Sequence, residues 1–549
     1  MEDKLFVIAI GGTGMRCLES FVHLCSIGMF DGKEVNILTL DTDYSNGNKG
    51  RVETLIELYN KVKKDGVTEG VTNVNTFFSA KLNLFRFFTD YSNQNRKNFN
   101  LLSAPVSAGL PDSDQIEQDN KDLSDLFLDS KVQEFNLEHG YRAQTHLGSM
   151  LMYHGILEAM KSVVENKDQA LPHQKALSQF VKALAAEPNA RVFVFGSVFG
   201  GTGASSIPII PKALKDAASL DGNNTLDLEK VKFASTLLTQ YFSFPSPDRR
   251  EKEREKIIAT SDNFAINSQA ALQFYQTDPT VRKFYKRLYH VGWPESARYS
   301  VAKEGKTLTG GAEQTNDCHV VELLCACAAY DFFNLKPESL ENADAEYVYR
   351  SVEEKDKMLS FTGKSFVDGD GGDLLANKLG VFFSFAHIVL SLNGAATRKE
   401  FGTKAFIKFL SQQKTPDYIS LTDEQTKEID DYMKFFAYDI DSKTKQLIPG
   451  WIYQINKSIG SGSFIFKSSA FEENVKRLEG IDPGDLFTDE KHKWKHGVFG
   501  SSYDTLGKII AEESSCKPNE EAQRVHTVKE KFLAHIYKGI AKAQNFEAR

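Results

Sequence analysis

Two glycine-rich segments carry the residues whose types and spacing could hold a phosphate group. Glycine lets the backbone approach an anion closely and adopt positive φ. Successive N–H groups in a loop that enters a helix form a concave anion site, which the helix dipole strengthens. These residues are Gly11, Gly12, Thr13 and Gly14 near the start of the chain and Gly200, Gly201, Thr202 and Gly203 in its middle. The alternative for the second segment is a plain tight turn, although a turn needs one glycine rather than three.

Each glycine segment stands between an apolar run and a helical pattern. Residues 5–10 precede the first segment and residues 192–195 precede the second, and both runs are typical of strands buried on both faces. Helices are expected over about 15–25 and from about 207 onwards. The pattern predicts an α/β fold with a parallel sheet.

A further apolar run, residues 35–40, ends at Asp41 and Asp43. A strand, a glycine loop, a helix and a second strand that ends in acids also open a dinucleotide-binding Rossmann unit, where the acid reaches ribose hydroxyls. That match is incomplete, because Cys17 stands where the third glycine is expected. A Walker P-loop is disfavoured, since the chain has no GxxxxGK[ST]. A nicotinamide enzyme that uses the first loop and Asp41 stays open as an alternative.

Length and composition limit the protein class. The 549 residues exceed one ordinary core, so two or three domains are expected. A net charge of −8 gives no general attraction to nucleic acid or to an anionic membrane, and neither is expected as a partner. The start of the chain runs directly into a strand without a signal peptide, and the longest apolar run, 381–392, is too short to cross a bilayer.

The six cysteines show no CxxC spacing. Buried thiols in a reducing compartment are therefore favoured over disulfides or a metal site. We expect a cytoplasmic protein with no cysteine-based metal centre.

Three loops that each enter a helix resemble the nucleotide site of the tubulin/FtsZ superfamily. They are GGTG at 11–14, GYRAQTHLG at 140–148 and GGTGASSIP at 200–208, and the last is similar to the superfamily's phosphate signature GGGTG[ST]G. LDTD at 40–43 resembles the superfamily's loop after the second strand, and 310–333 resembles its long central helix. The resemblance covers roughly residues 1–335 and is closest to the divergent prokaryotic tubulin-like proteins.

The resemblance implies a site for GTP or GDP with Mg²⁺. Phosphates would lie on the two glycine segments and on Gln144, and Arg142 could contact the terminal phosphate or could be a surface arginine. The sugar or Mg²⁺ would lie near Asp41 and Asp43, and the base near Asn316. The preference for guanine over adenine comes from the resemblance alone.

In the superfamily, acids from one subunit complete the nucleotide site of the next, so hydrolysis requires head-to-tail self-association into filaments. The best candidates here are Asp370 and Asp373, which stand before an apolar helix expected over 374–392. A solvated turn and a metal-binding loop are the alternatives. The superfamily's N-x-D-x-x-[DE] loop is not matched clearly, which keeps open a rival function: a scaffold that binds GTP without turnover and recruits another protein.

The predicted domains are a tubulin/FtsZ-like nucleotide domain over 1–307, with a helical insertion at 44–137, a central helix over 308–334, and an α+β second domain with C-terminal helices over 335–549. Three local expectations accompany this division. Residues 85–99 are predicted to include a helix packed by Phe85, Phe87 and Phe88, residues 451–466 to be strands and loops, and Glu322 to be solvated.

Overall fold

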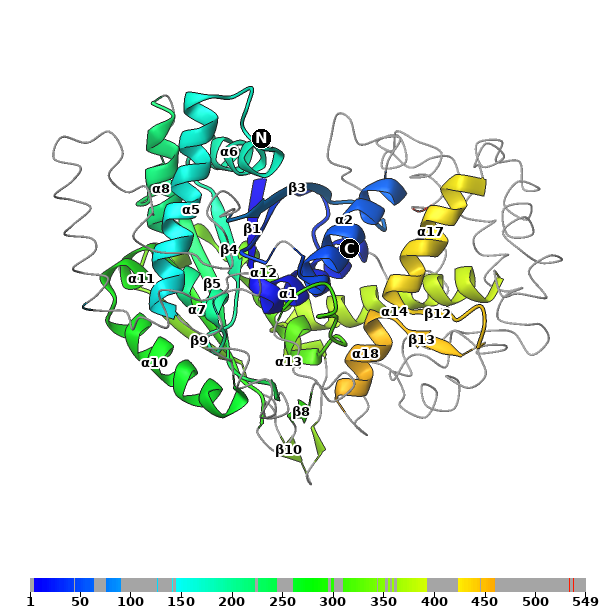
Figure 1. Cartoon of the computed structure of the whole chain (residues 1–549). Helices are drawn as coiled ribbons and strands as arrows, with labels where there is room; N and C mark the ends of the chain where they lie inside the picture. Colours follow the sequence, from blue (N-terminus) through cyan, green and yellow to red (C-terminus); the bar gives the residue numbers. More distant parts are fainter. Residues whose placement is uncertain are drawn as a thin grey trace, which may run out of the picture.

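A parallel sheet of seven strands forms the centre of the fold (Figure 1). The computed structural model describes residues 4–43, 45–63, 76–89, 126, 141, 145–222, 226–243, 260–294, 298–300, 310–342, 344–350, 354–355, 358–359, 363–392, 423–444, 446–459, 533 and 537. The strand order is β3-β2-β1-β4-β5-β7-β9, which confirms the α/β class. The strands are β1 (Lys4–Ile10), β2 (Glu34–Asp41), β3 (Lys81–Phe88), β4 (Arg191–Phe195), β5 (Lys232–Leu238), β7 (Tyr285–Val291) and β9 (Glu346–Arg350).

Helices cover both faces of the sheet, because successive side chains of its apolar strands point to opposite sides. In β1, Val7 belongs to the core on one side and Ile8 to the core on the other. The first core is closed by α1 (Gly11–Ser26), α2 (Gly47–Lys63), α12 (Val320–Asn334), α14 (Asp370–Leu392), α17 (Asp423–Phe436) and α18 (Trp451–Ser458). The second core is closed by α5 (Thr145–Glu165), α6 (Pro172–Ala185), α8 (Ile210–Leu220), α10 (Phe264–Thr277) and α11 (Pro279–Phe284).

Shorter elements complete the described fold. The six-residue α7 (Gly201–Ser206) follows β4 after a five-residue loop, 196–200. The helix α13 spans Gly363–Phe366, and two 3₁₀ turns span Ser261–Asn263 and Pro337–Leu340. The strands β6 (Phe242–Ser243) and β8 (Tyr299–Ser300) form a parallel pair. Two antiparallel hairpins are formed by β10 (Glu354–Lys355) with β11 (Met358–Leu359) and by β12 (Tyr438–Ile440) with β13 (Leu447–Pro449).

The central helix α12 is buried because it is apolar on almost every side. It begins at Val320, later than the expected 308–334, because His319 and Glu322 form a capping box. The Val321 N–H donates to His319 Nδ1 (3.3 Å), and the His319 N–H donates to Glu322 Oε2 (2.9 Å). The expected solvated Glu322 is wrong, since this side chain is 0% exposed.

The predicted helix around Phe85 is wrong. Residues 81–88 form β3, which pairs with β2 at the edge of the main sheet. Leu82 belongs to one core and Phe87 to the other, which is the period of two that a strand requires. The sheet thus takes a strand from within the predicted 44–137 insertion, and it takes β9 from beyond residue 307.

Residues 451–458, expected as strand and loop, instead form α18. Trp451, Ile452 and Ile455 are fully buried on it, a spacing that fits one face of a helix. The Trp451 indole N–H donates to Ser20 Oγ of α1 (2.9 Å), and the Tyr432 hydroxyl of α17 lies 3.1 Å from His23 Nδ1 of α1. The described helices after residue 370 therefore share one continuous core with α1 and α2.

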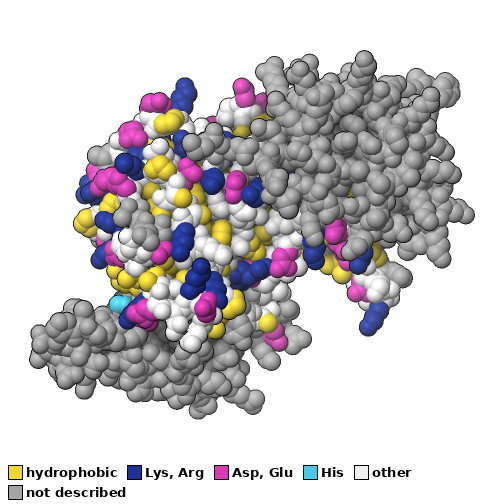
Figure 2. Space-filling model, turned by 90° about the horizontal axis from the view of Figure 1, so that it is seen from above, with side chains coloured by type: hydrophobic (Ala, Val, Ile, Leu, Met, Phe, Trp, Pro, Cys, Tyr) yellow, Lys and Arg dark blue, Asp and Glu magenta, His cyan; other side chains and the backbone are white. Residues whose placement is uncertain are grey.

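The face in Figure 2 carries described acidic and basic side chains interspersed with small apolar areas. Such mixing of both signs fits the modest net charge of −8. Among the described helices, none combines the length and the apolar character that a bilayer crossing requires.

Candidate functional site

The two glycine segments lie against each other at the carboxyl ends of the central strands β1 and β4, which we call the carboxyl edge of the sheet. Strands β1 and β4 are parallel neighbours, with Ile8 opposite Val194. The first glycine segment follows β1 directly, and the second follows β4 after residues 196–199. Gly11 has φ +67°, a conformation that favours glycine, and a Cβ placed on it would lie 3.2 Å from Thr202 Cβ. Segments that lie about 190 residues apart in sequence therefore form one surface.

Close backbone contacts explain two of the other glycines. A Cβ on Gly14 would lie 2.5 Å from the Phe195 carbonyl oxygen, and a Cβ on Gly203 would lie 2.6 Å from the Ser197 carbonyl oxygen. Only a residue without a side chain allows the start of α1 to approach the end of β4 this closely. The contact of Gly203 with Ser197 is local, so the plain turn stays open as the alternative for the second segment, whereas the contact of Gly14 joins segments far apart in the sequence.

The two glycine segments lie where the strand order of the sheet changes direction. From β1, the chain builds the sheet toward β2 and β3 on one side and, from β4, toward β5, β7 and β9 on the other. Open α/β sheets bind ligands outside the carboxyl ends of the strands where the strand order reverses. That point lies between β1 and β4, which is where both glycine segments begin.

The acids after β2 border the same edge. Asp43 Oδ2 accepts a hydrogen bond from the Gly311 N–H (2.6 Å), and Asp41 Oδ1 accepts one from the Thr42 N–H (2.8 Å). Asp41 Oδ2 and Thr42 Oγ1 are buried and have no hydrogen-bond partner among the described residues. Burial, followed by the neighbouring Asp43 charge, raises the pKa of Asp41 to about 7.

These two oxygens suit a ribose hydroxyl, which would donate a hydrogen bond, or a hydrated Mg²⁺, which would supply positive charge. Asp41 and Asp43 are the residues that would hold it. Within the described ranges, no group of three or more His, Cys, Asp or Glu side chains is arranged to bind a metal ion.

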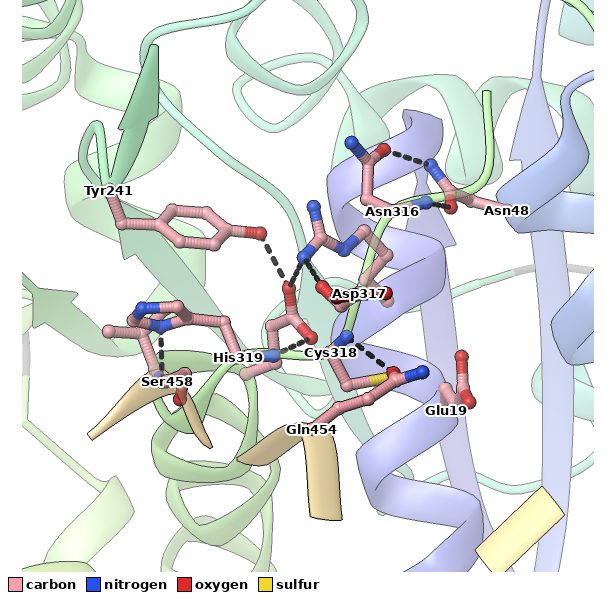
Figure 3. Close-up of polar contacts among 12 residues, drawn as sticks. Glu19, Asn48, Tyr241, Asn316, Asp317, Cys318, His319, Gln454 and Ser458 are labelled. Carbon is pink, nitrogen blue, oxygen red and sulfur yellow. Dashed lines mark hydrogen bonds and ion pairs between the residues drawn. The ribbon is translucent and has the colours of Figure 1, made fainter. Parts of the chain in front are cut away.

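Two pairs of amide side chains lie beside the first glycine segment, and Figure 3 shows one of them, Asn48 with Asn316. Asn46 Nδ2 donates to Gln314 Oε1 (2.7 Å), and Asn48 exchanges two hydrogen bonds with Asn316, each 3.1 Å long. A Cβ on Gly12 would lie 3.3 Å from both Asn46 Nδ2 and Gln314 Oε1. The structure thus brings Asn316, the predicted base-side residue, next to the first glycine segment.

A buried ion pair joins the elements that surround the site. Arg16 Nη2 of α1 lies 2.5 Å from Glu322 Oε1 of α12 and donates to the Asp317 carbonyl oxygen (2.5 Å). The Tyr241 hydroxyl, from the loop after β5, also donates to Glu322 Oε1 (2.7 Å), as Figure 3 shows. Burial and the Arg16 charge lower the pKa of His319 to about 3, which keeps this capping imidazole neutral.

The described part of the third predicted loop, Tyr141 and 145–148, lies beside α7. The Ser149 hydroxyl donates to the Ser205 carbonyl oxygen of α7 (2.7 Å), and a Cβ on Gly148 would lie 2.5 Å from Tyr141 Cδ2. Arg142 and Gln144 lie outside the described residues, so their predicted contacts with phosphate stay predictions.

Asp370 and Asp373 lie far from the glycine segments. Both are exposed in the first turn of α14, and a Cβ on the intervening Gly371 would lie 3.8 Å from Tyr330 Cε1 of α12. The carboxyl end of α12 lies beside the amino ends of the strands, since Arg191 at the start of β4 donates to the Phe332 carbonyl oxygen (3.1 Å). Tyr330 follows Val320, at the start of α12, by ten residues, which is about 15 Å along the helix. The two acids therefore do not reach the glycine segments of their own chain.

The comparisons with known proteins add no assignment: no protein-family model, curated protein or solved structure matches this chain. Fold and site together define a doubly wound α/β protein with a glycine-lined edge at its topological switch point.

Sequence reasoning missed four residues of this site: Arg16, Asn46, Asn48 and Gln314. Asn46 and Asn48 stand two residues apart just before a helix, where Asn is a common cap, and Asn46 Oδ1 does accept from the Asn48 N–H (3.0 Å). That local signal was available. The pairing of these residues with 314–316 was not, because it joins residues 268 positions apart.

Proposed function

We propose that this chain is a tubulin/FtsZ-like protein that binds GTP and hydrolyses it when chains associate head to tail. The observation that carries the proposal is the contact of Gly11 with Thr202 at the switch point between β1 and β4. A single glycine loop would fit many folds. Two glycine loops that meet where α/β proteins bind ligands fit a nucleotide with several phosphates better.

Each group around the edge has a role in this proposal. Backbone N–H groups of 11–14 and 200–203 hold phosphate oxygens, and Asp41 with Asp43 binds the ribose or the hydrated cation. Asn316 faces the base. Bound Mg²⁺ would supply positive charge that offsets the phosphate oxygens.

The separation of about 15 Å along α12, from Val320 to Tyr330, supports hydrolysis between subunits rather than within one. Asp370 and Asp373 are exposed on the side of the molecule where the strands begin, opposite the glycine segments. A second chain stacked in the same orientation therefore brings its acids toward the nucleotide of the first chain. There they would orient the attacking water. A contact of this heterologous kind repeats without closing and produces a filament.

Nucleotide binding is tested by thermal unfolding with GTP, ATP or NAD in the presence of Mg²⁺. We expect GTP to raise the midpoint, because a ligand present at 100 times its Kd stabilises the folded state by about 2.7 kcal/mol. Gly200→Val removes this rise. Gly200 has φ −89° and ψ 177°, which valine adopts. Among the described residues a Cβ on it meets only Ser197 Oγ, at 3.4 Å, so the fold itself tolerates the change.

Gly50→Ala is the matched control for that experiment. A Cβ on Gly50 meets nothing within 4 Å, and the position lies inside α2, so alanine adds about 1 kcal/mol of helix propensity. The rise caused by GTP stays as in the wild type. Stabilisation by NAD alone would instead favour the nicotinamide enzyme, and no stabilisation by any of the three would contradict nucleotide binding.

Hydrolysis between subunits is tested by mixing two inactive variants. We expect the double variant Asp370→Asn, Asp373→Asn to bind GTP normally. It should hydrolyse GTP at least about 100-fold more slowly, since both orienting carboxylates are lost. Adding Gly200→Val chains restores turnover, because they supply intact acids to nucleotide held by the first variant. Phosphate release against protein concentration is the measurement.

Two results would decide against this mechanism. Wild-type turnover in the Asp370→Asn, Asp373→Asn chain would exclude the two acids. GTP binding by the wild type without phosphate release at any protein concentration would favour the non-hydrolysing scaffold that recruits a partner.

A further inference from the structure

Residues 310–317 cross the first glycine segment as a short stretch without regular secondary structure, which we call the strap. It is fastened to the start of α2 and the acids before it. The hydrogen bonds run from Gly47 N to Gly311 O (3.0 Å), Gly311 N to Asp43 Oδ2 (2.6 Å), Asn46 Nδ2 to Gln314 Oε1 (2.7 Å), Asn48 Nδ2 to Asn316 Oδ1 (3.1 Å) and Asn316 N to Asn48 Oδ1 (3.1 Å).

The strap lies close enough to the glycine segment to control access to it. A Cβ on Gly12 would lie 3.3 Å from Gln314 Oε1, and a Cβ on Gly47 would lie 2.5 Å from the Ala312 carbonyl oxygen. A ligand that spans from the phosphate loops to Asn316 therefore passes between Gly12 and the strap or displaces the strap.

The two ends of the strap are held differently. At its carboxyl end, Arg16 binds the Asp317 carbonyl oxygen, and Gln454 Oε1 of α18 accepts from the Cys318 N–H (2.8 Å) in buried surroundings (Figure 3). The hydrogen bonds given above for the remainder involve neutral amide groups and the Asp43 carboxylate, and Ala312, Glu313 and Thr315 are exposed. Segments with exposed side chains and few buried contacts open locally before the rest of a protein does. The strap can thus lift from α2 while its buried end stays in place.

We propose that the strap sets the rate at which the nucleotide enters and leaves, with the Asn46–Gln314 and Asn48–Asn316 pairs as its fasteners. This inference rests on the proposed function, since it describes access to the same site. The inference adds a step to the proposed function: exchange of the nucleotide requires the amide pairs to open, and the pairs re-form over the bound ligand.

Stopped-flow release of a fluorescently labelled GTP tests this step in the full-length chain. Asn48→Ala and Gln314→Ala are the informative variants, because Asn46 also caps α2 by accepting from the Asn48 and Lys49 N–H groups. Gln314→Ala loses one neutral hydrogen bond and is expected to speed both association and release by about 2- to 12-fold. Asn48→Ala loses two, so about 5- to 150-fold is expected. Asn60→Ala is the control, since Asn60 lies on the same helix but donates to the Leu82 carbonyl oxygen (3.1 Å).

Hydrogen exchange of the same proteins without ligand gives an independent measurement. The backbone N–H groups of Gly311 and Asn316 are expected to exchange faster in Asn48→Ala than in Asn60→Ala. Equal exchange and equal release in the two variants would overturn the strap proposal while GTP binding stands. Failure of the wild type to bind labelled GTP would overturn the proposed function, and the role of the strap with it.

Discussion

Replacing Glu322 with glutamine is expected to lower the free energy of unfolding by about 3–5 kcal/mol, the usual effect of leaving one partner of a buried ion pair alone. Glu322 is 0% exposed, and its carboxylate accepts from Arg16, the Tyr241 hydroxyl and the His319 N–H. Glutamine offers one acceptor oxygen, so its NH₂ group must face one of these donors. Urea unfolding followed by circular dichroism measures the loss.

A double-mutant cycle separates the ion pair from the rest of this network. Arg16→Met removes the charge that Glu322→Gln leaves unpaired, so the second substitution is expected to cost at least about 2 kcal/mol less in the presence of the first. Simple additivity of the two effects would contradict the pairing seen at 2.5 Å. Because Arg16 also holds the Asp317 carbonyl oxygen, the same variants are expected to loosen the carboxyl end of the strap.

Trp451→Ala is expected to destabilise the protein by about 3–5 kcal/mol, as truncation of a buried tryptophan does. The Trp451 ring is 0% exposed and lies 4.8 Å from the His23 ring and 5.6 Å from the Phe436 ring. Its loss leaves a cavity between α1, α17 and α18 and removes the hydrogen bond to Ser20. Urea unfolding of the whole chain is again the measurement.

Tyr349→Ala is the matched aromatic control, because Tyr349 on the edge strand β9 is 72% exposed. A surface change of this kind stays within about 0.5 kcal/mol. If Trp451→Ala were as mild as Tyr349→Ala, the described C-terminal helices would not be packed on α1. The core would then have to be divided at the predicted domain boundary instead.

Patterns between near neighbours in sequence were sufficient for the central strands and the glycine segments. Residues 5–10 are apolar without a break, which is typical of a strand covered on both faces, and they form β1. The same reasoning fails at residues 81–88, where clustered phenylalanines suit a helix face as well as an edge strand. The neighbouring β2, rather than any local preference, selects the strand there.

The sequence by itself determined the α/β class, the two glycine segments and the acids that follow β2, because backbone preference and apolar period depend on residues a few positions apart. Only the tertiary structure decided that Gly11 lies against Thr202, that Asn48 pairs with Asn316, and that the helix carrying Asp370 starts at the far edge of the sheet. These relations join residues separated by up to hundreds of positions. They follow from how the helices pack on the sheet, and no local pattern encodes a distance between two such residues.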